Sequence, residues 1–133
     1  MPFRIYASPH LRLMVVTFHG TVTAQEISTA FQNVPDTEGW EPGFDTFWDC
    51  RKIDKLEFEP SCLAPVTEVG KAATRKYGPG RGAIVTPREL DRDIAQLLLI
   101  RMQDGLRERR LFSDLDAAAT WLGLDPGAIA PPS

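Results

Sequence analysis

Short apolar runs and helically spaced apolar residues alternate along this chain. Residues 3–7 and 12–20 are rich in β-branched and aromatic side chains, and Pro9 between them suits a tight turn. This pattern predicts a hairpin at the start of the chain. The run from Leu13 to Phe18 is apolar at nearly every position, so we expect other elements to cover this strand on both faces.

Four helices and three more strands are predicted after the hairpin. The helices are recognised from apolar residues spaced by three and four positions, and the first begins with a capping box formed by Thr23 and Glu26. The expected elements are strand 3–7, strand 12–20, helix 23–34, strand 44–50, helix 60–77, strand 82–86, helix 86–104, strand 106–112 and helix 113–122.

The alternation of strands and helices sets the expected architecture. Strands separated by helices imply right-handed crossovers, so the sequence predicts an α/β fold. We expect a single mixed, mostly parallel sheet of about five strands with about four helices, and with the first strand antiparallel. One domain would span residues 1–124. The Pro- and Ala-rich tail, residues 125–133, is expected to be disordered.

Composition narrows the classes of function. The chain has 133 residues and a formal net charge of −3, which argues against general binding to nucleic acid or to a membrane surface. No apolar run approaches the roughly 20 residues that cross a bilayer. The start of the sequence lacks the hydrophobic region of a signal peptide, so we expect a cytoplasmic protein.

Metal and cofactor chemistry is not expected. Cys50 and Cys62 do not form a CxxC motif, and in a cytosolic protein both thiols should be reduced. His10 and His19 flank a predicted strand, but no Cys or His lies near them at the spacing of metal ligands.

Three stretches carry a resemblance to a known family. They are "VVTFHGTVTAQEI" at 15–27, "FWDC" at 47–50 and "LFSDLDAAATWLGL" at 111–124. With the order of elements, they make residues 3–124 resemble the SpoIIAA-like group of the STAS superfamily, which includes anti-sigma-factor antagonists. The resemblance implies the SpoIIAA/STAS-like fold and a regulatory role exerted through a binding partner.

The same resemblance points to Ser61 as a possible phospho-acceptor. In the antagonists, the helix after the third strand begins with an Asp-Ser-Ser-Gly type motif whose phosphorylated serine switches partner binding. The matching stretch here is Glu59 to Leu63. It keeps a serine, has Pro60 in place of the aspartate, lacks the glycine, and has Cys62 about where the acceptor is expected.

Four residues are candidates for a ligand or partner site. Ser61 and Cys62 lie at a predicted helix start, where unpaired N–H groups attract anions and lower the pKa of a thiol, although Cys62 also begins the apolar stripe of that helix. Asp49 is expected at a strand end, where parallel sheets gather ligand-binding loops. Trp40, in the Gly- and Pro-rich segment 38–44, either covers the edge of the core or meets a ligand.

Three functions follow from these residues. We favour a non-catalytic regulatory or interaction domain that binds a protein partner or a small ligand near the loop 50–62, because no nucleophile–base pair or metal cluster is evident. A thiol-dependent enzyme or redox sensor using Cys62 is the first alternative. A structural homodimer is the second, built on the helix 94–102, whose apolar stripe is unusually wide.

Overall fold

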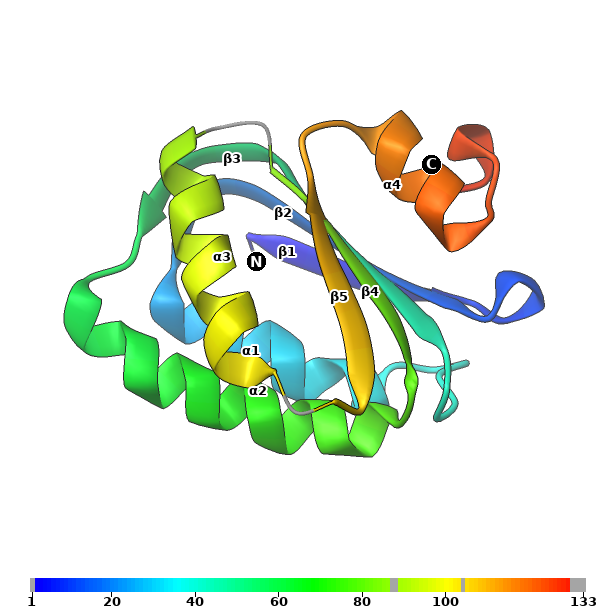
Figure 1. Ribbon diagram of the computed structural model, residues 1–133, viewed down its shortest axis with the longest axis horizontal. Helices are drawn as coiled ribbons and strands as arrows, with labels where there is room; N and C mark the ends of the chain where they lie inside the picture. The colour runs from blue at the N-terminus through cyan, green and yellow to red at the C-terminus, as the bar shows by residue number, and fades with distance from the viewer. Residues whose placement is uncertain (1, 87–88, 104, 130–133) are drawn as a thin grey trace.

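The computed structural model describes residues 2–86, 89–103 and 105–129, which form a five-stranded sheet with helices on both faces (Figure 1). The strands lie side by side in chain order from β1 to β5. Their bounds are β1 Phe3–Ser8, β2 Leu13–Thr23, β3 Asp45–Glu57, β4 Gly80–Val85 and β5 Arg107–Phe112. The first strand is antiparallel to the second, and every later pairing is parallel. The predicted single mixed sheet is therefore confirmed.

Four α-helices complete the layers. Helices α1 (Ala24–Asn33), α2 (Leu63–Tyr77) and α3 (Glu89–Met102) cover one face of the sheet, and α4 (Leu115–Leu122) covers the other (Figure 1). None of the helices in the described part of the chain combines the length and apolar character needed to cross a membrane.

Alternate residues of the central strands enter separate cores. In β2, Met14 and Val16 pack with residues of α1 and α2, whereas Leu13 and Val15 pack with residues of α4. All four side chains are at most 2% exposed. This arrangement confirms the expectation from the run of apolar residues in this strand, because a strand with helices on both sides buries every position.

The predicted helix signals are also found. The Glu26 backbone N–H donates to the Thr23 hydroxyl oxygen over 3.3 Å, and the Thr23 N–H donates to the Glu26 carboxylate over 2.9 Å, which completes the capping box at the start of α1. At the end of α4, Gly123 has φ of 75°, a left-handed conformation that glycine adopts without strain.

Strand β3 is longer than expected. The sequence predicts a strand over 44–50, but the strand continues to Glu57 and pairs with the end of β2, where Gly20 lies opposite Ile53 and Thr23 opposite Glu57. Most side chains of this extension are exposed, so it lacks the apolar run used to recognise strands. Hydrogen bonding of its backbone to β2, rather than burial of its side chains, forms this part of the strand. The expected loop 50–62 is therefore mostly strand.

The C-terminal tail differs from its expected disorder. Residues Pro126–Ile129 form a short 3-10 helix, and Ile129 is only 3% exposed because it packs in the core beneath α4. The Tyr6 hydroxyl donates a hydrogen bond of 2.9 Å to the Ile129 carbonyl oxygen. The expectation of disorder is therefore wrong for 126–129, and residues 130–133 lie outside the described part of the chain.

Candidate functional site

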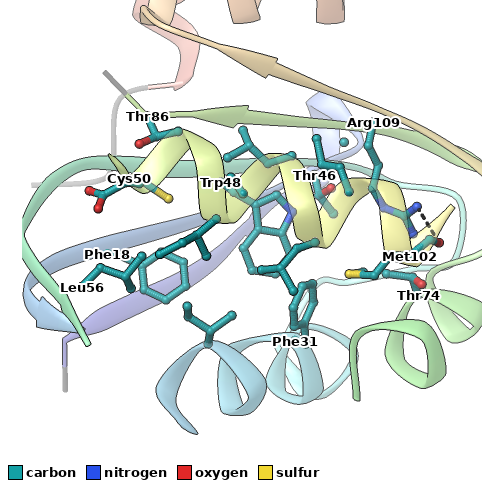
Figure 2. A pocket seen from close by; sticks show the side chains of 18 of the residues that line it. Phe18, Phe31, Thr46, Trp48, Cys50, Leu56, Thr74, Thr86, Met102 and Arg109 are labelled. Carbon is teal, nitrogen blue, oxygen red and sulfur yellow. Dashed lines mark hydrogen bonds between the residues drawn. The ribbon is translucent and has the colours of Figure 1, made fainter. Parts of the chain in front are cut away.

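A cavity of about 100 Å³ lies between the sheet and the layer formed by α1, α2 and α3 (Figure 2). Its walls are mostly apolar, and the ring of Trp48 lies near its middle. Other large apolar side chains that line it are Phe18, Phe31, Ile84, Leu98 and Met102. Its volume and its apolar walls make this space a candidate binding site.

The strand pattern and two glycines shape the packing around the cavity. Alternate residues of β3, including Trp48 and Cys50, face this side of the sheet. Gly70 of α2 lets α3 approach closely, since a Cβ there would lie 2.7 Å from the terminal methyl of Met102. In β4, Gly82 leaves room beside Thr46, whose hydroxyl oxygen would lie 3.0 Å from an added Cβ.

Polar side chains stand at two ends of this apolar space. Thr86 and Cys50 lie at one end, and Thr74 and Arg109 lie at the other (Figure 2). Thr86 is four residues after Gly82, whose Cα is paired with that of Arg109, so the backbones of Thr86 and Arg109 are separated by about 13 Å along the strands. A ligand in this space would meet apolar walls along its length and polar groups at its ends.

Thr86 places a buried hydroxyl group in the cavity wall. The residue is 1% exposed, and its side-chain oxygen has no hydrogen-bond partner among the described residues. Its backbone is held in place because the Thr86 N–H donates to the Phe112 carbonyl oxygen over 3.0 Å. Asp91 also lines the cavity and is 4% exposed.

Burial controls the protonation of two further cavity residues. Desolvation raises the pKa of Cys50 to about 12, and the negative charges of Asp49 and Asp91 add to the shift, so Cys50 is a neutral thiol at physiological pH. Burial also raises the pKa of Tyr77, against the opposing effect of Arg107 and Arg109. The Tyr77 hydroxyl donates to the Phe31 carbonyl oxygen over 2.6 Å.

Arg107 and Arg109, at the other end of the cavity from Thr86, donate hydrogen bonds to backbone carbonyl oxygens. Arg107 is 6% exposed and donates to the carbonyl oxygens of Gly78 (2.7 Å), Phe44 (3.0 Å) and Arg81 (3.1 Å). Arg109 donates to the Met102 carbonyl oxygen over 3.4 Å. These bonds join the start of β4 and the end of α3 to β5.

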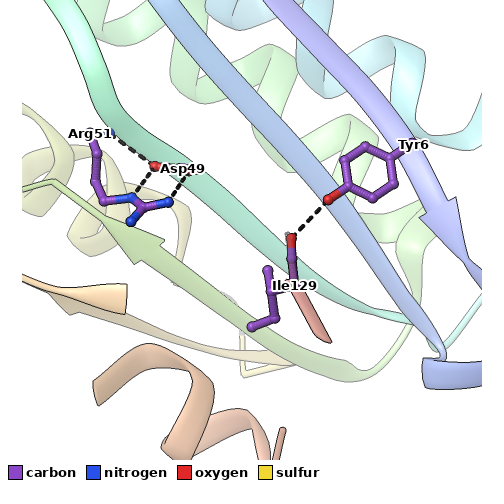
Figure 3. A network of polar contacts seen from close by, with 4 residues as sticks. All are labelled: Tyr6, Asp49, Arg51 and Ile129. Carbon is purple, nitrogen blue, oxygen red and sulfur yellow. Dashed lines mark hydrogen bonds and ion pairs between the residues drawn. The ribbon is translucent and has the colours of Figure 1, made fainter. Parts of the chain in front are cut away.

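Asp49 is placed differently from its prediction. It lies within β3, eight residues before the strand ends, and on the opposite face from the cavity. Its carboxylate accepts three hydrogen bonds of 2.8 to 3.0 Å from the backbone N–H and guanidinium of Arg51 (Figure 3). Its charge also raises the pKa of Tyr6, after the larger effect of burial. The role of Asp49 as a ligand residue stays a prediction.

Ser61, Cys62 and Trp40 are not brought together with Asp49. Ser61 is exposed in a 3-10 turn, Pro60–Cys62, directly before α2, and Cys62 is partly buried against the core shared by α1, α2 and α3. Neither side chain forms a hydrogen bond in the described part of the chain. Trp40 is partly buried and packs against the core between the sheet, α1 and α2. Phosphorylation of Ser61 and catalysis or redox sensing by Cys62 stay predictions.

The sequence indicated some of the cavity but missed its main polar group. The sequence predicted only that Cys50 is a reduced thiol and that a helix begins at position 86. The available signal was position, because Thr86 directly follows β4 and the carboxyl ends of parallel strands commonly meet ligands. No group of three or more His, Cys, Asp or Glu residues able to hold a metal ion lies within the described ranges.

Comparison with known proteins identifies the fold. No protein-family model and no curated protein matches the sequence. A solved structure from Shewanella loihica PV-4, an uncharacterized DUF3478-family protein with a SpoIIAA-like fold, is similar over 90% of this chain and 91% of its own, with a TM-score of 0.55 and 17% identity. The unphosphorylated anti-sigma-factor antagonist SpoIIAA covers 89% of this chain and 94% of its own, with a TM-score of 0.46 and 12% identity. The sheet order, the strand directions and the first of these likenesses show that the chain has the SpoIIAA/STAS-like fold.

Proposed function

We propose that this protein is a non-catalytic regulatory domain that binds a small, mainly apolar molecule in the cavity between the sheet and α1–α3. The cavity carries this proposal, because an apolar space of about 100 Å³ binds small apolar molecules when water gains little by filling it. The site also includes Cys50, Ile53 and Leu56 from the stretch near which the sequence predicts a ligand. The SpoIIAA-like fold suggests a regulatory or interaction domain.

The occupied cavity would act by changing how α3 packs on the sheet. Ile94, Leu98 and Met102 of α3 line the cavity, while Leu97 and Ile100 of the same helix are 48% and 58% exposed. A ligand that contacts the inner side of this helix therefore alters the position of its outer side. Such a coupling gives the ligand a route to a protein partner.

Toluene binding tests the proposal. We expect toluene to shift the amide resonances of the residues around the cavity in ¹⁵N-labelled protein, with saturation in the millimolar range or below. Ala95 lines the cavity, so Ala95→Phe should fill it and abolish binding. Ala72→Phe is the matched control, since Ala72 is exposed on α2. Wild-type protein that does not bind toluene, or binding that survives Ala95→Phe in a folded variant, would refute the proposal.

A homodimer built on the helix 94–102 is a second candidate. The exposure of Leu97 and Ile100 favours it, because adjacent large apolar side chains on a surface often belong to an interface. We expect sedimentation velocity at about 100 μM to show a dimer. Ile100→Glu should return it to a monomer, and a monomeric wild-type protein at this concentration would exclude the interface.

A further inference from the structure

We infer that the molecule in the cavity is a neutral alcohol or phenol whose hydroxyl group hydrogen-bonds the Thr86 side chain. This inference rests on the proposed function and specifies the class of ligand. It depends on the position of Thr86, on the charges that line the cavity, and on the aromatic groups beside it.

The Thr86 side chain requires a partner that the described residues do not supply. Its hydroxyl lines the cavity, its oxygen is inaccessible to bulk solvent, and its backbone is fixed by the hydrogen bond to Phe112. A buried hydroxyl without a partner lowers stability, so such groups are uncommon in folded proteins. A ligand with a polar atom at this end of the cavity would satisfy it.

The charges in the cavity wall favour a neutral ligand. Asp91, 4% exposed, lines the cavity and acts electrostatically on Cys50, which Figure 2 places at the Thr86 end. A carboxylate or phosphate bound to Thr86 would meet this negative charge in a region of low dielectric constant. Arg107 and Arg109 also line this mostly apolar cavity, and moving a charged group of either sign from water into it carries a desolvation cost that a neutral hydroxyl avoids. A hydroxyl group carries no charge and both donates and accepts hydrogen bonds, as Thr86 does.

Aromatic side chains define the rest of the ligand. The Trp48 ring has its centroid 5.0 Å from that of Phe31 and 6.4 Å from that of Phe18, and all three residues line the cavity. Such a wall suits a planar ring or a short hydrocarbon chain. The hydroxyl of the ligand would lie at the Thr86 end and the apolar body beside Trp48 (Figure 2).

Three probes with the same carbon skeleton test the inference: toluene, benzyl alcohol and benzoate. Their dissociation constants are measured by amide chemical-shift titration of the wild-type protein and of Thr86→Val, which keeps the shape of the side chain and removes its hydroxyl. Thr74→Val is the matched control, because Thr74 also lines the cavity but its hydroxyl donates to the Lys71 carbonyl oxygen over 3.3 Å.

We expect Thr86→Val to weaken benzyl alcohol binding by roughly threefold to tenfold, which is the effect of one hydrogen bond, and to leave toluene binding unchanged or stronger. Thr74→Val should change the ratio of the two constants by less than about twofold, and benzoate should bind at least about tenfold more weakly than benzyl alcohol. An equal effect of Thr86→Val on both ligands, or tighter binding of benzoate, would overturn the inference while toluene binding still supported the cavity. Failure of all three probes would refute the proposed function as well.

Discussion

At the scale of the residue, Thr86 carries a buried hydroxyl that is expected to lower the stability of the ligand-free protein. Its hydroxyl is removed from water and has no hydrogen-bond partner among the described residues, whereas the hydroxyls of Thr67 and Thr74 donate to carbonyl oxygens of their own helix. Valine would fill the same space with no polar atom. The presence of threonine at this position is therefore consistent with a bound molecule that supplies the partner.

Thr86→Val should stabilise the ligand-free protein. Removing an unsatisfied buried hydroxyl recovers its desolvation cost, so we expect the free energy of unfolding to rise by about 1 kcal/mol. Urea denaturation measures this change. The control, Thr74→Val, should lower the same quantity by up to about 1 kcal/mol, because it removes a hydrogen bond that is formed. A Thr86→Val variant less stable than the wild type would contradict the assignment.

The raised pKa of Cys50 predicts that the protein loses stability at alkaline pH. Its folded pKa of about 12 lies above its ordinary value of 9.0, so the unfolded chain releases this proton first as the pH rises. The contribution of the Cys50 thiol to the free energy of unfolding is therefore complete below about pH 9 and declines above it. Between pH 8 and pH 10 the free energy of unfolding should fall by about 1 kcal/mol from this group.

Cys50→Ala should remove this part of the pH dependence, whatever its effect on stability at neutral pH. Denaturation at pH 8 and pH 10 compares the two proteins. If the free energy of unfolding changes by the same amount between pH 8 and pH 10 in both proteins, the Cys50 thiol titrates normally in the folded state. Cys62 remains in both proteins and does not affect the comparison.

At the scale of elements, β3 combines two environments in one strand. Its first half is buried between helices, and its second half projects beyond them with mostly exposed side chains. Asp49 and Arg51 lie near the change from one to the other, and their ion pair has side-chain exposures of 7% and 38%. The structure therefore favours a structural role for Asp49.

Asp49→Asn tests that role. We expect it to lower the free energy of unfolding by about 1–2 kcal/mol, because the paired guanidinium loses its counter-charge near a buried position. Glu57→Gln is a suitable control in the same strand, since the pair of Glu57 with Lys55 is exposed and should contribute less than about 0.5 kcal/mol. Toluene affinity should not change in either variant. A loss of affinity in Asp49→Asn alone would return Asp49 to the ligand site.

At the scale of the molecule, segments near the two ends of the described chain meet on the α4 side of the sheet. Tyr6 and Ile129 are separated by 123 positions in the sequence and are joined by a hydrogen bond. Ile129 also completes the core on the α4 side. The domain therefore extends beyond residue 124, where the sequence pattern predicted its end.

Ile129→Ala should lower the free energy of unfolding by about 2 kcal/mol, because it leaves a space beside buried apolar residues. Thermal or urea denaturation measures the effect. Ala128→Ser, at an exposed neighbouring position, is the control and should change stability by less than about 0.5 kcal/mol. Equal stability of Ile129→Ala and the wild type would support the original expectation of a disordered tail.

The sequence alone determined the order and type of the elements, the direction of β1 and the capping box at Thr23. These features depend on local spacing and on the chemistry of neighbouring residues, which can be read along the chain. Tertiary structure decided the extension of β3, the packing of Ile129 and the cavity around Trp48. Each of these features depends on groups that are distant in the sequence. The β3 extension needs the end of β2 as its partner, Ile129 needs apolar residues of other elements to pack against, and the cavity arises where the sheet and the helices do not fit closely. Periodicity predicts which face of an element is buried, but the space left between buried faces exists only after the layers pack together.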